Sequence, residues 1–532
     1  MWRHICFLFI ATRAAYSNTI LVNTPVGLIR GAKAIDGEYY TFFGIPYGSV
    51  NRTNLFGAPE KYPKFDYIFE AFHDSAICPQ IQNNVLQGSS DCLQLNIFVP
   101  ISANISHRLP VMVYIHGGSF IDGSKSSKTY GPKYLVKHDV ILVVINYRLG
   151  PYGFMCLDIP EVPGNQGLKD QVLALKWIKQ NIESFGGDAT KITVFGISAG
   201  GHSIEFHLLS DNEILFNKAI LQSGSAEAAT VFTDHDKNAP IRIAERLGLS
   251  TNSLTKAITY LSSLHTNEVI QASNDLSITY KPCVEQKFEG VTPFLTRHWV
   301  NADIPKVKDM PILLGFCEHE LLLQHINSSI SEFPALIRNR LRNTFNFDNG
   351  NLIKAQEIIQ NYYLNNKNVN TDLPIAAYFD SDFTYIHPIQ RSIKKFLNSK
   401  PKSLFYYMFS YNGNRNLAKI TKKVKFGSAV HADDVGYLFD VDYLVDEHTP
   451  EDMLVLDRIT TMWTNFAKYG DPTPDTSELL EIKWTQLSNE RYTYLNINSI
   501  LAMGQRPAAD RMTFWDDFYI NNKKYQKGFQ DD

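Results

Sequence analysis

The chain has 532 residues, of which 44% are hydrophobic and 20% are charged. This composition is that of a globular protein, and it excludes a mainly disordered, collagenous or coiled-coil chain. The formal net charge is −3, so the strong basic field of a nucleic-acid-binding protein is absent and we expect no nucleic-acid partner. Length alone, at roughly 150 residues per domain, would allow about three or four domains.

The first 17 residues resemble a secretory signal peptide. Arg3 precedes an apolar run at Ile5–Ala11, and mostly small residues follow as far as Ser17. A charged start, a short apolar segment and small residues at the cleavage site are typical of such signals. We therefore predict that residues 1–17 are removed and that the protein is secreted, with a frayed terminus as the alternative. No later stretch has the roughly 18 apolar residues of a membrane helix, so no membrane span is expected.

Three triplets in the chain fit export from the cell. Asn51, Asn104 and Asn327 each begin an Asn-X-Ser/Thr acceptor for N-linked glycosylation. Such triplets also arise by chance, so they support secretion only in combination with the leader.

The cysteines predict few disulfides. The chain contains Cys6, Cys78, Cys92, Cys156, Cys283 and Cys317. Cys6 would leave with the signal peptide, so at least one of the remaining five thiols is unpaired within a monomer. This is not a small disulfide scaffold, and the hydrophobic core must stabilise the fold.

The middle of the chain alternates apolar segments with amphipathic ones. Val111–Ile115 and Val140–Ile145 are near-continuous apolar runs, as buried strands are. Apolar residues then recur at the helical period from 168 to 182. The same pattern continues as strands at Ile192–Phe195, Ala219–Leu221, Ile312–Leu314 and Leu404–Phe409, with a helix at Ala199–Leu209. This order predicts an α/β fold with a large, mostly parallel central sheet flanked by helices.

A candidate nucleophile lies where a predicted strand meets a predicted helix. Ser198 is the centre of the pentad from Gly196 to Gly200. A strand-to-helix turn of this kind strains the backbone and exposes the serine hydroxyl above the sheet. The pentad alone is weak evidence for a nucleophile, but its position between a predicted strand and a predicted helix supports this interpretation. The alternative is a plain turn in which Ser198 caps the helix.

A nucleophilic serine also needs donors for an oxyanion. The segment His116–Phe120 follows the predicted strand and is of the HGGG type, in which glycines let backbone N–H groups approach the oxygen. Ser119 replaces the third glycine and keeps its N–H. A phosphate-binding loop is the alternative, but Lys125 stands one place too late for that motif.

The residues by themselves identify the acid and the base less clearly than they identify the nucleophile. In the order serine, acid, histidine, the acid follows a later strand, and Glu318 and Glu320 both fit that position. His431 lies in a loop that contains glycine, but nothing in its spacing selects it from the 15 histidines. A zinc-protease pattern around Glu320 would need a histidine where Leu323 stands. We expect no metal and no organic cofactor.

Taken in order, these motifs resemble the type-B carboxylesterases of the cholinesterase/carboxylesterase group, and insect carboxylesterases most of all. The matching segments are Phe43–Tyr47, Asp91–Asn96, His116–Phe120, Asn146–Pro151, Gly164–Gln171, Phe185–Asp188, Gly196–Gly200, Leu221–Gly224 and His431–Asp434. The resemblance implies the α/β-hydrolase fold in one domain over residues 18–532. It also implies a serine carboxylesterase that hydrolyses small-molecule esters through an acyl-enzyme, without a cofactor, as a monomer or weak homo-oligomer.

The resemblance also implies roles for single residues. Ser198 would be the nucleophile, Glu320 rather than Glu318 the acid, and His431 the base. The oxyanion donors would be the N–H groups of Gly118, Ser119 and Ala199. Further implied features are Ser223 beside the acid, a Cys78–Cys92 disulfide, and an ion pair between Arg148 and Asp170.

One departure from the family pattern precedes the serine. Ile197 stands where most members have Glu and some have Gln. We expect its loss to tune rate or substrate choice, and it counts against a juvenile hormone esterase, in which Gln is usual.

Other departures lie in the first part of the chain. A family Arg–Glu pair is replaced by Leu55 and Ser90, and the loss of both partners together can be nearly neutral. The Cys78–Cys92 loop has no tryptophan to bind a quaternary ammonium by cation–π attraction, so choline esters are poor candidates. The family's second disulfide is not evident.

Two alternatives to a fast hydrolase stay open: a slow esterase that sequesters organophosphates, and a non-catalytic cholinesterase-like binding protein. The complete set of candidate residues favours an enzyme. The near-neutral net charge fits small, largely apolar esters.

Overall fold

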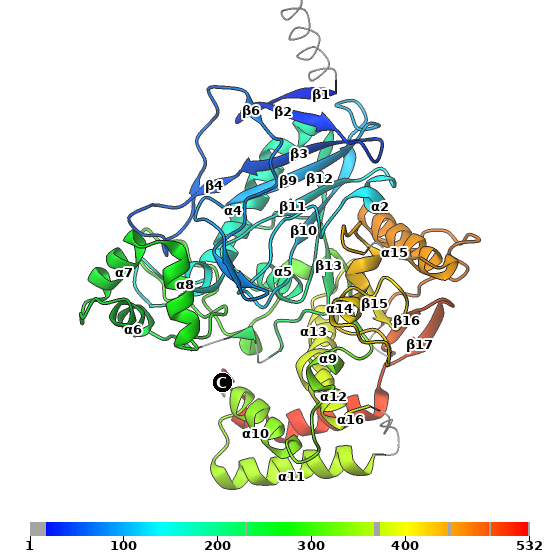
Figure 1. Cartoon of the computed structure of the whole chain (residues 1–532). Coiled ribbons are helices and arrows are strands. Elements are labelled where there is room, and N and C mark those ends of the chain that lie inside the picture. The colour runs from blue at the N-terminus through cyan, green and yellow to red at the C-terminus, as the bar shows by residue number, and fades with distance from the viewer. Residues whose placement is uncertain are drawn as a thin grey trace, which may run out of the picture.

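One large mixed sheet organises the fold (Figure 1). In spatial order its strands are β1 (Thr19–Thr24), β2 (Gly27–Lys33), β3 (Tyr39–Pro46), β9 (Gln94–Pro100), β11 (Ile141–Ile145), β10 (Leu109–Ile115), β12 (Gly187–Ile197), β13 (Lys218–Gln222), β14 (Pro311–Cys317), β15 (Ser403–Phe409), β16 (Thr493–Ile497) and β17 (Ala502–Gln505), with β6 (Phe69–Glu70) beside β2. Two short ribbons lie apart from it, β4 (Gly48–Ser49) with β5 (Glu60–Lys61) and β7 (Gln80–Gln82) with β8 (Val85–Gln87). This computed structural model describes residues 18–228, 231–232, 234–366, 373–444, 448–488 and 491–529, so the predicted signal peptide lies outside the described residues.

The centre of the sheet is parallel and its margins are antiparallel. Neighbours from β11 to β16 all run parallel. The pairs from β1 through β9 to β11, and the pair β16–β17, run antiparallel. The predicted α/β architecture is therefore confirmed, whereas the antiparallel margins were not anticipated.

The predicted central elements are present. Every residue of β10, β11 and β14 is buried, which explains their unbroken apolar sequences. The helix predicted from 168 to 182 is α4 (Gln166–Asn181), and the helix predicted at Ala199–Leu209 is α5 with the same bounds.

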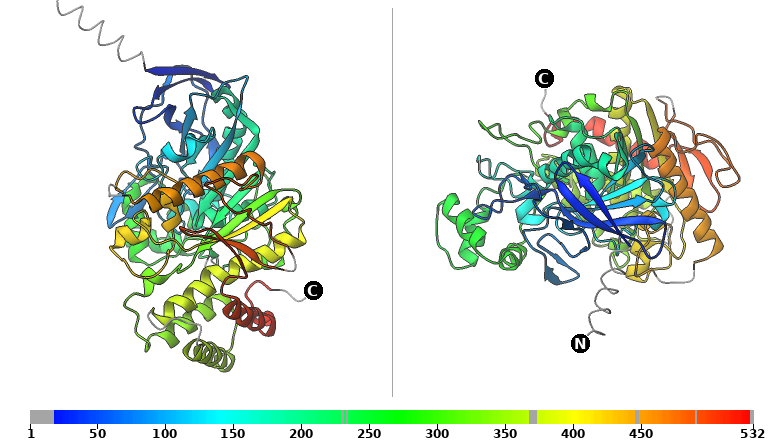
Figure 2. Two further views of the ribbon diagram at one scale, coloured as in Figure 1. Left: turned by 90° about the vertical axis from the view of Figure 1, so that its right-hand side faces the viewer. Right: turned by 90° about the horizontal axis from the view of Figure 1, so that it is seen from above.

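Helices cover both faces of the sheet. Val111 and Val113 of β10 share an apolar cluster with α4 and α5, whereas Met112 and Tyr114 share another with α15 (Pro450–Tyr469). Successive side chains of a strand point to opposite faces of the sheet, so alternate residues of β10 contribute to the two clusters. Figure 2 shows α15, in orange, lying across its face of the sheet.

The described residues form further α-helices. They are α2 (Lys133–Val136), α3 (Gly150–Phe154), α6 (Ala239–Arg246), α7 (Leu254–Ser263), α8 (Thr266–Asp275), α9 (Leu322–His325), α10 (Phe333–Thr344), α11 (Asn349–Asn365), α12 (Ile375–Ser381), α13 (His387–Asn398), α14 (Leu417–Lys422) and α16 (Ala509–Asn521). A π-helical turn, Asp382–Ile386, joins α12 to α13. Helices α10 and α11 lie at the end of the molecule remote from β1 (Figures 1 and 2). Within the described ranges, no helix is long and apolar enough to cross a bilayer.

Two disulfides crosslink the part of the chain that the structure describes. Cys78 is bonded to Cys92, and Cys156 is bonded to Cys283 with the Cα atoms 6.7 Å apart. Cys317 is buried and unpaired. The sequence left the pairing of Cys156 and Cys283 open, because the two cysteines are 127 residues apart and only the tertiary fold brings them together.

A buried ion pair joins α4 to the segment after β11. Arg148 donates through Nε and Nη2 to the two carboxylate oxygens of Asp170, at 2.9 and 2.7 Å. Its Nη1 donates to the carbonyl oxygens of Leu55 and Gly57. Leu55 itself packs in the apolar cluster, so the position where the family resemblance implies an arginine is part of the core.

Candidate active site

Ser198 occupies a strained turn between β12 and α5. Its φ is 55° and its ψ −122°, a combination that non-glycine residues rarely adopt and that is found mainly at functional sites. The flanking glycines allow this turn to lie against β10. A Cβ atom on Gly196 would lie 2.5 Å from the Ile115 carbonyl oxygen, and one on Gly200 would lie 2.0 Å from it.

Glu320 follows β14 and contacts His431. The Glu320 Oε2 atom lies 2.5 Å from His431 Nδ1. Oε1 accepts hydrogen bonds from the Ser223 hydroxyl at 2.6 Å and from the Cys317 N–H at 2.8 Å. Each carboxylate oxygen thus has a partner, and it is Glu320, not Glu318, that the structure brings to His431.

The environment of His431 favours its charged form. Burial acts to lower the pKa of His431, but the negative charge and hydrogen bond of Glu320 outweigh it, and the pKa is raised above 6.5. Because Nδ1 faces Glu320, the ring's other nitrogen, Nε2, is available to a substrate or nucleophile.

The loop that carries His431 is held by a buried aspartate. The Asp433 carboxylate accepts from the N–H groups of Val430, Ala418 and Lys419, and from Asn416 Nδ2 at 2.9 Å. Burial raises the pKa of Asp433 to about 6. Sequence reasoning gave this residue no role, although it lies within the matching His431–Asp434 segment.

Two of the predicted oxyanion donors, Ser119 and Ala199, line the same cavity as Ser198. The backbone is left-handed at Gly118 and Ser119, and within the described part of the chain neither N–H donates to another protein group. A Cβ atom on Gly118 would lie 2.0 Å from the Asp122 carbonyl oxygen. Ala199 is the first residue of α5, where backbone N–H groups have no partner within the helix.

Sequence reasoning missed Tyr385, which lies in the π-helical turn. Burial raises the pKa of Tyr385 above its usual value, while the adjacent Ser198 side chain acts to lower it. The ring centroid lies 4.7 Å from that of His431. Single-turn π-helices occur often at functional sites, but nothing in the sequence marks this one.

A cavity of about 210 Å³ opens beside Ser198. It is lined by Ser119, Phe120, Ser198, Ala199, His202, Val231, Lys281, Leu321, Gln324, Arg340, Thr384 and Tyr385. Burial lowers the pKa of His202 to about 3, so this histidine is neutral at physiological pH. Ile197, the departure noted before the serine, is buried in the apolar cluster with α15.

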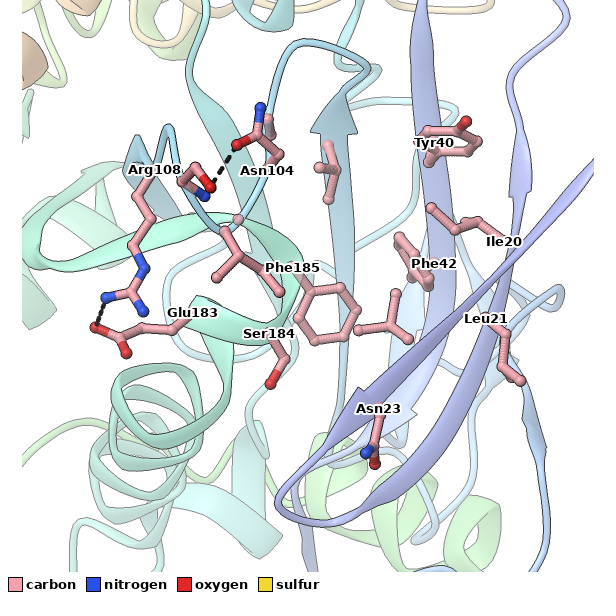
Figure 3. Close-up of a pocket in the computed structure, with 16 residues that line it drawn as sticks. Ile20, Leu21, Asn23, Tyr40, Phe42, Asn104, Arg108, Glu183, Ser184 and Phe185 are labelled. Atoms are coloured by element: carbon pink, nitrogen blue, oxygen red, sulfur yellow. Dashed lines mark hydrogen bonds and ion pairs between the residues drawn. The ribbon is translucent and has the colours of Figure 1, made fainter.

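A larger hollow, of about 850 Å³, lies elsewhere on the molecule. Figure 3 shows it between β1, β3 and the segment before β10, with an ion pair between Arg108 and Glu183 at 2.7 Å. It contains Asn104 but none of the candidate catalytic residues. The three predicted glycosylation acceptors, Asn51, Asn104 and Asn327, are all exposed.

A strained serine at the end of a parallel strand, and a histidine–glutamate pair from later loops, are the features of an α/β-hydrolase. The chain belongs to the carboxylesterase family, whose model, described as "Carboxylesterase family", matches residues 18–515. The resemblance noted from the sequence is thereby confirmed, and the protein is a carboxylic ester hydrolase.

Named relatives support this assignment. Juvenile hormone esterase of Tribolium castaneum is 30% identical, over 88% of this chain and 86% of that protein. Esterase FE4 of Myzus persicae is also 30% identical, over 89% of each chain. The crystal structure of juvenile hormone esterase from Manduca sexta, with OTFP covalently attached, superposes with a TM-score of 0.81 at 26% identity, over 94% of this chain and all of that one. Relatives with different names are equally similar, so identity does not select a substrate.

Proposed function

We propose that this protein is a secreted serine carboxylesterase that uses Ser198, His431 and Glu320 as its catalytic triad. The observation that carries the proposal is the 2.5 Å contact between His431 and Glu320. Ser198 is held in a strained turn, and Tyr385 lies next to both Ser198 and the His431 ring. A histidine oriented by a carboxylate is what activates a serine hydroxyl.

In the first half of the reaction, Ser198 Oγ forms a bond to the ester carbonyl carbon while His431 Nε2 takes the hydroxyl proton. The negative charge of Glu320 stabilises the resulting imidazolium. The N–H groups of Gly118, Ser119 and Ala199 stabilise the oxyanion. Collapse of the tetrahedral intermediate breaks the bond to the alcohol, which leaves with the proton from the histidine.

The second half repeats these steps with water. His431 takes a proton from water, the hydroxide oxygen attacks the acyl carbon, and Ser198 leaves with the proton returned. No metal or organic cofactor takes part in the proposed steps.

Secretion rests on different grounds. The pattern of residues 1–17 is that of a signal peptide, and the Cys78–Cys92 and Cys156–Cys283 disulfides suit an oxidising compartment. We further propose that residues 18–532 form one domain, active as a monomer or weak homo-oligomer, with glycans on Asn51, Asn104 and Asn327.

The test is hydrolysis of p-nitrophenyl butyrate by the wild type and by Ser198→Ala. We expect the variant to lose at least about 10³-fold in kcat, as for other serine hydrolases without their nucleophile. Ser250→Ala, which changes an exposed serine, is the matched control. Unchanged activity in Ser198→Ala would overturn the proposal. A stoichiometric burst with a stable adduct and little turnover would indicate a sequestering esterase instead.

A further inference from the structure

His202 lies one turn of α5 beyond the candidate nucleophile. Its N–H donates to the Ser198 carbonyl oxygen at 2.8 Å, and its side chain forms part of the wall of the cavity at Ser198. The ring centroid lies 6.5 Å from that of Phe120, in the predicted oxyanion loop, and 6.4 Å from that of Tyr385. The catalytic steps proposed above give this histidine no task, although it lies beside the reacting groups.

The surroundings of His202 Nδ1 determine which ring nitrogen carries the hydrogen. The Ser225 N–H lies 2.8 Å from Nδ1, and the Ser225 carbonyl oxygen lies 2.9 Å from it. A backbone amide always carries its hydrogen, which is here directed at Nδ1, so Nδ1 is the acceptor and has no room for a hydrogen of its own. Burial lowers the pKa of His202 to about 3, so the ring is neutral. Its single N–H is therefore on Nε2.

The Nε2–H group of His202 faces no acceptor among the described residues. The hydrogen-bond contacts that this part of the chain makes with the ring are both at Nδ1. His202 is only 5% exposed, and a donor so deeply buried is costly unless it meets an acceptor. The two ring nitrogens point in nearly opposite directions, so Nδ1 faces Ser225 and Nε2 is left to the cavity that the ring lines. The acceptor that can reach it is one that enters with the substrate.

Other polar side chains of this wall already have partners within the protein. Arg340 and Thr384 both donate to the buried Asp380, and Lys281 interacts with another group as well. Buried apolar side chains form a further part of the wall: Phe120, Val231 and Leu321. A neutral donor in such a wall discriminates between substrates, because a ligand that brings no acceptor leaves the donor unpaired.

From this arrangement we propose that His202 is a specificity-determining residue, whose Nε2–H donates to the substrate, and that the preferred esters carry a neutral oxygen acceptor in the part that lies in this cavity. This inference rests on the proposed function, because it assigns the substrate class of the same site. The simpler interpretation is that His202 only ties α5 to Ser225. That interpretation accounts for Nδ1 and leaves the donor at Nε2 without a partner.

The test compares esters of the same length in which an ether oxygen replaces a methylene group. On the acyl side, p-nitrophenyl 3-methoxypropanoate is paired with the pentanoate and p-nitrophenyl 4-methoxybutanoate with the hexanoate. On the alcohol side, 2-methoxyethyl acetate is paired with butyl acetate. Each ratio of kcat/KM is divided by the ratio of the rates in alkali without enzyme, which corrects for intrinsic reactivity. In at least one pair we expect the wild type to prefer the ether.

Two variants separate the two nitrogens of the ring. His202→Asn keeps an acceptor near the position of Nδ1 for the Ser225 N–H but has no atom at the position of Nε2. We expect it to lower the corrected ratio by about fivefold, as for loss of one neutral hydrogen bond, with little change in Tm. His202→Gln places an amide N–H near the position of Nε2 and loses the bond to Ser225, so it should retain most of the preference at a lower Tm. His107→Asn makes the same change at an exposed site and should leave both unchanged.

The outcomes separate this inference from the proposed function. If no ester is hydrolysed by the wild type in a Ser198-dependent way, the proposed function itself fails. If the esters are hydrolysed but the wild type prefers the ether in none of the pairs, the inference about His202 is overturned and the esterase assignment stands; this comparison requires no variant to fold. The same conclusion follows if His202→Asn keeps the wild-type ratio, or if it slows both members of each pair equally.

Discussion

Replacing Glu320 by glutamine removes the negative charge beside His431 while keeping the size of the side chain. With charge centres about 4 Å apart and an effective dielectric constant of about 20, the carboxylate stabilises the imidazolium by about 4 kcal/mol. Because each 1.36 kcal/mol is about tenfold in rate, we expect Glu320→Gln to lower kcat for p-nitrophenyl butyrate by about 10³-fold.

The pH dependence gives an independent readout of the same change. The neutral imidazole is the base, so activity rises as the pH increases through the pKa of His431, which Glu320 raises. Without Glu320, burial remains as the largest influence on His431, so the pKa falls. We expect the rise in kcat/KM to move to lower pH in the variant.

The matched control is Glu318→Gln, since Glu318 lies two residues away and makes no contact with His431. Thermal unfolding should show that both variants are folded. A loss of less than about tenfold in Glu320→Gln, or a pH profile that does not move, would refute this account of the triad.

Three further substitutions probe the structure around the site. Gly200→Ala places a Cβ atom 2.0 Å from a carbonyl oxygen of β10, so we expect poor folding and a lowered Tm, and a normal melting curve would contradict the close packing of the turn. Tyr385→Phe removes the hydroxyl that contacts the nucleophile but keeps the ring. We expect kcat/KM to fall by up to about tenfold with an unchanged Tm. Full activity would show that the hydroxyl has no part in positioning Ser198. Arg148→Met leaves Asp170 buried without its partner and should lower the free energy of unfolding in urea by about 3–5 kcal/mol; a loss below about 1 kcal/mol would mean that the pair is not buried in solution.

The local sequence pattern was sufficient to predict the strands and helices at the centre of the fold. Unbroken apolar runs predicted the buried strands, and the run from Ala199 to Leu209 predicted α5 to the residue. These features follow from short-range sterics and from burial on both faces of a strand. The antiparallel margins were not predicted, because β1 and β17 are only partly buried and therefore have no unbroken apolar run.

The candidate site, too, was predictable only in part from the local sequence. The small residues around Ser198 signal its turn, because only glycine fits where the chain meets β10. Spacing alone could not choose between Glu318 and Glu320, since both follow the same strand. The choice required either the family resemblance or the bond to His431.

The sequence by itself determined the class of fold, the family and the candidate nucleophile, because these depend on residues that are neighbours in the chain. Only the tertiary structure decided the pairing of Cys156 with Cys283, the contact of Tyr385 with the nucleophile, and the place of His202 in the wall of the nucleophile's cavity. The physical reason is that covalent and electrostatic contacts act over a few ångströms of space. The order of residues along the chain therefore does not say which side chains a substrate meets.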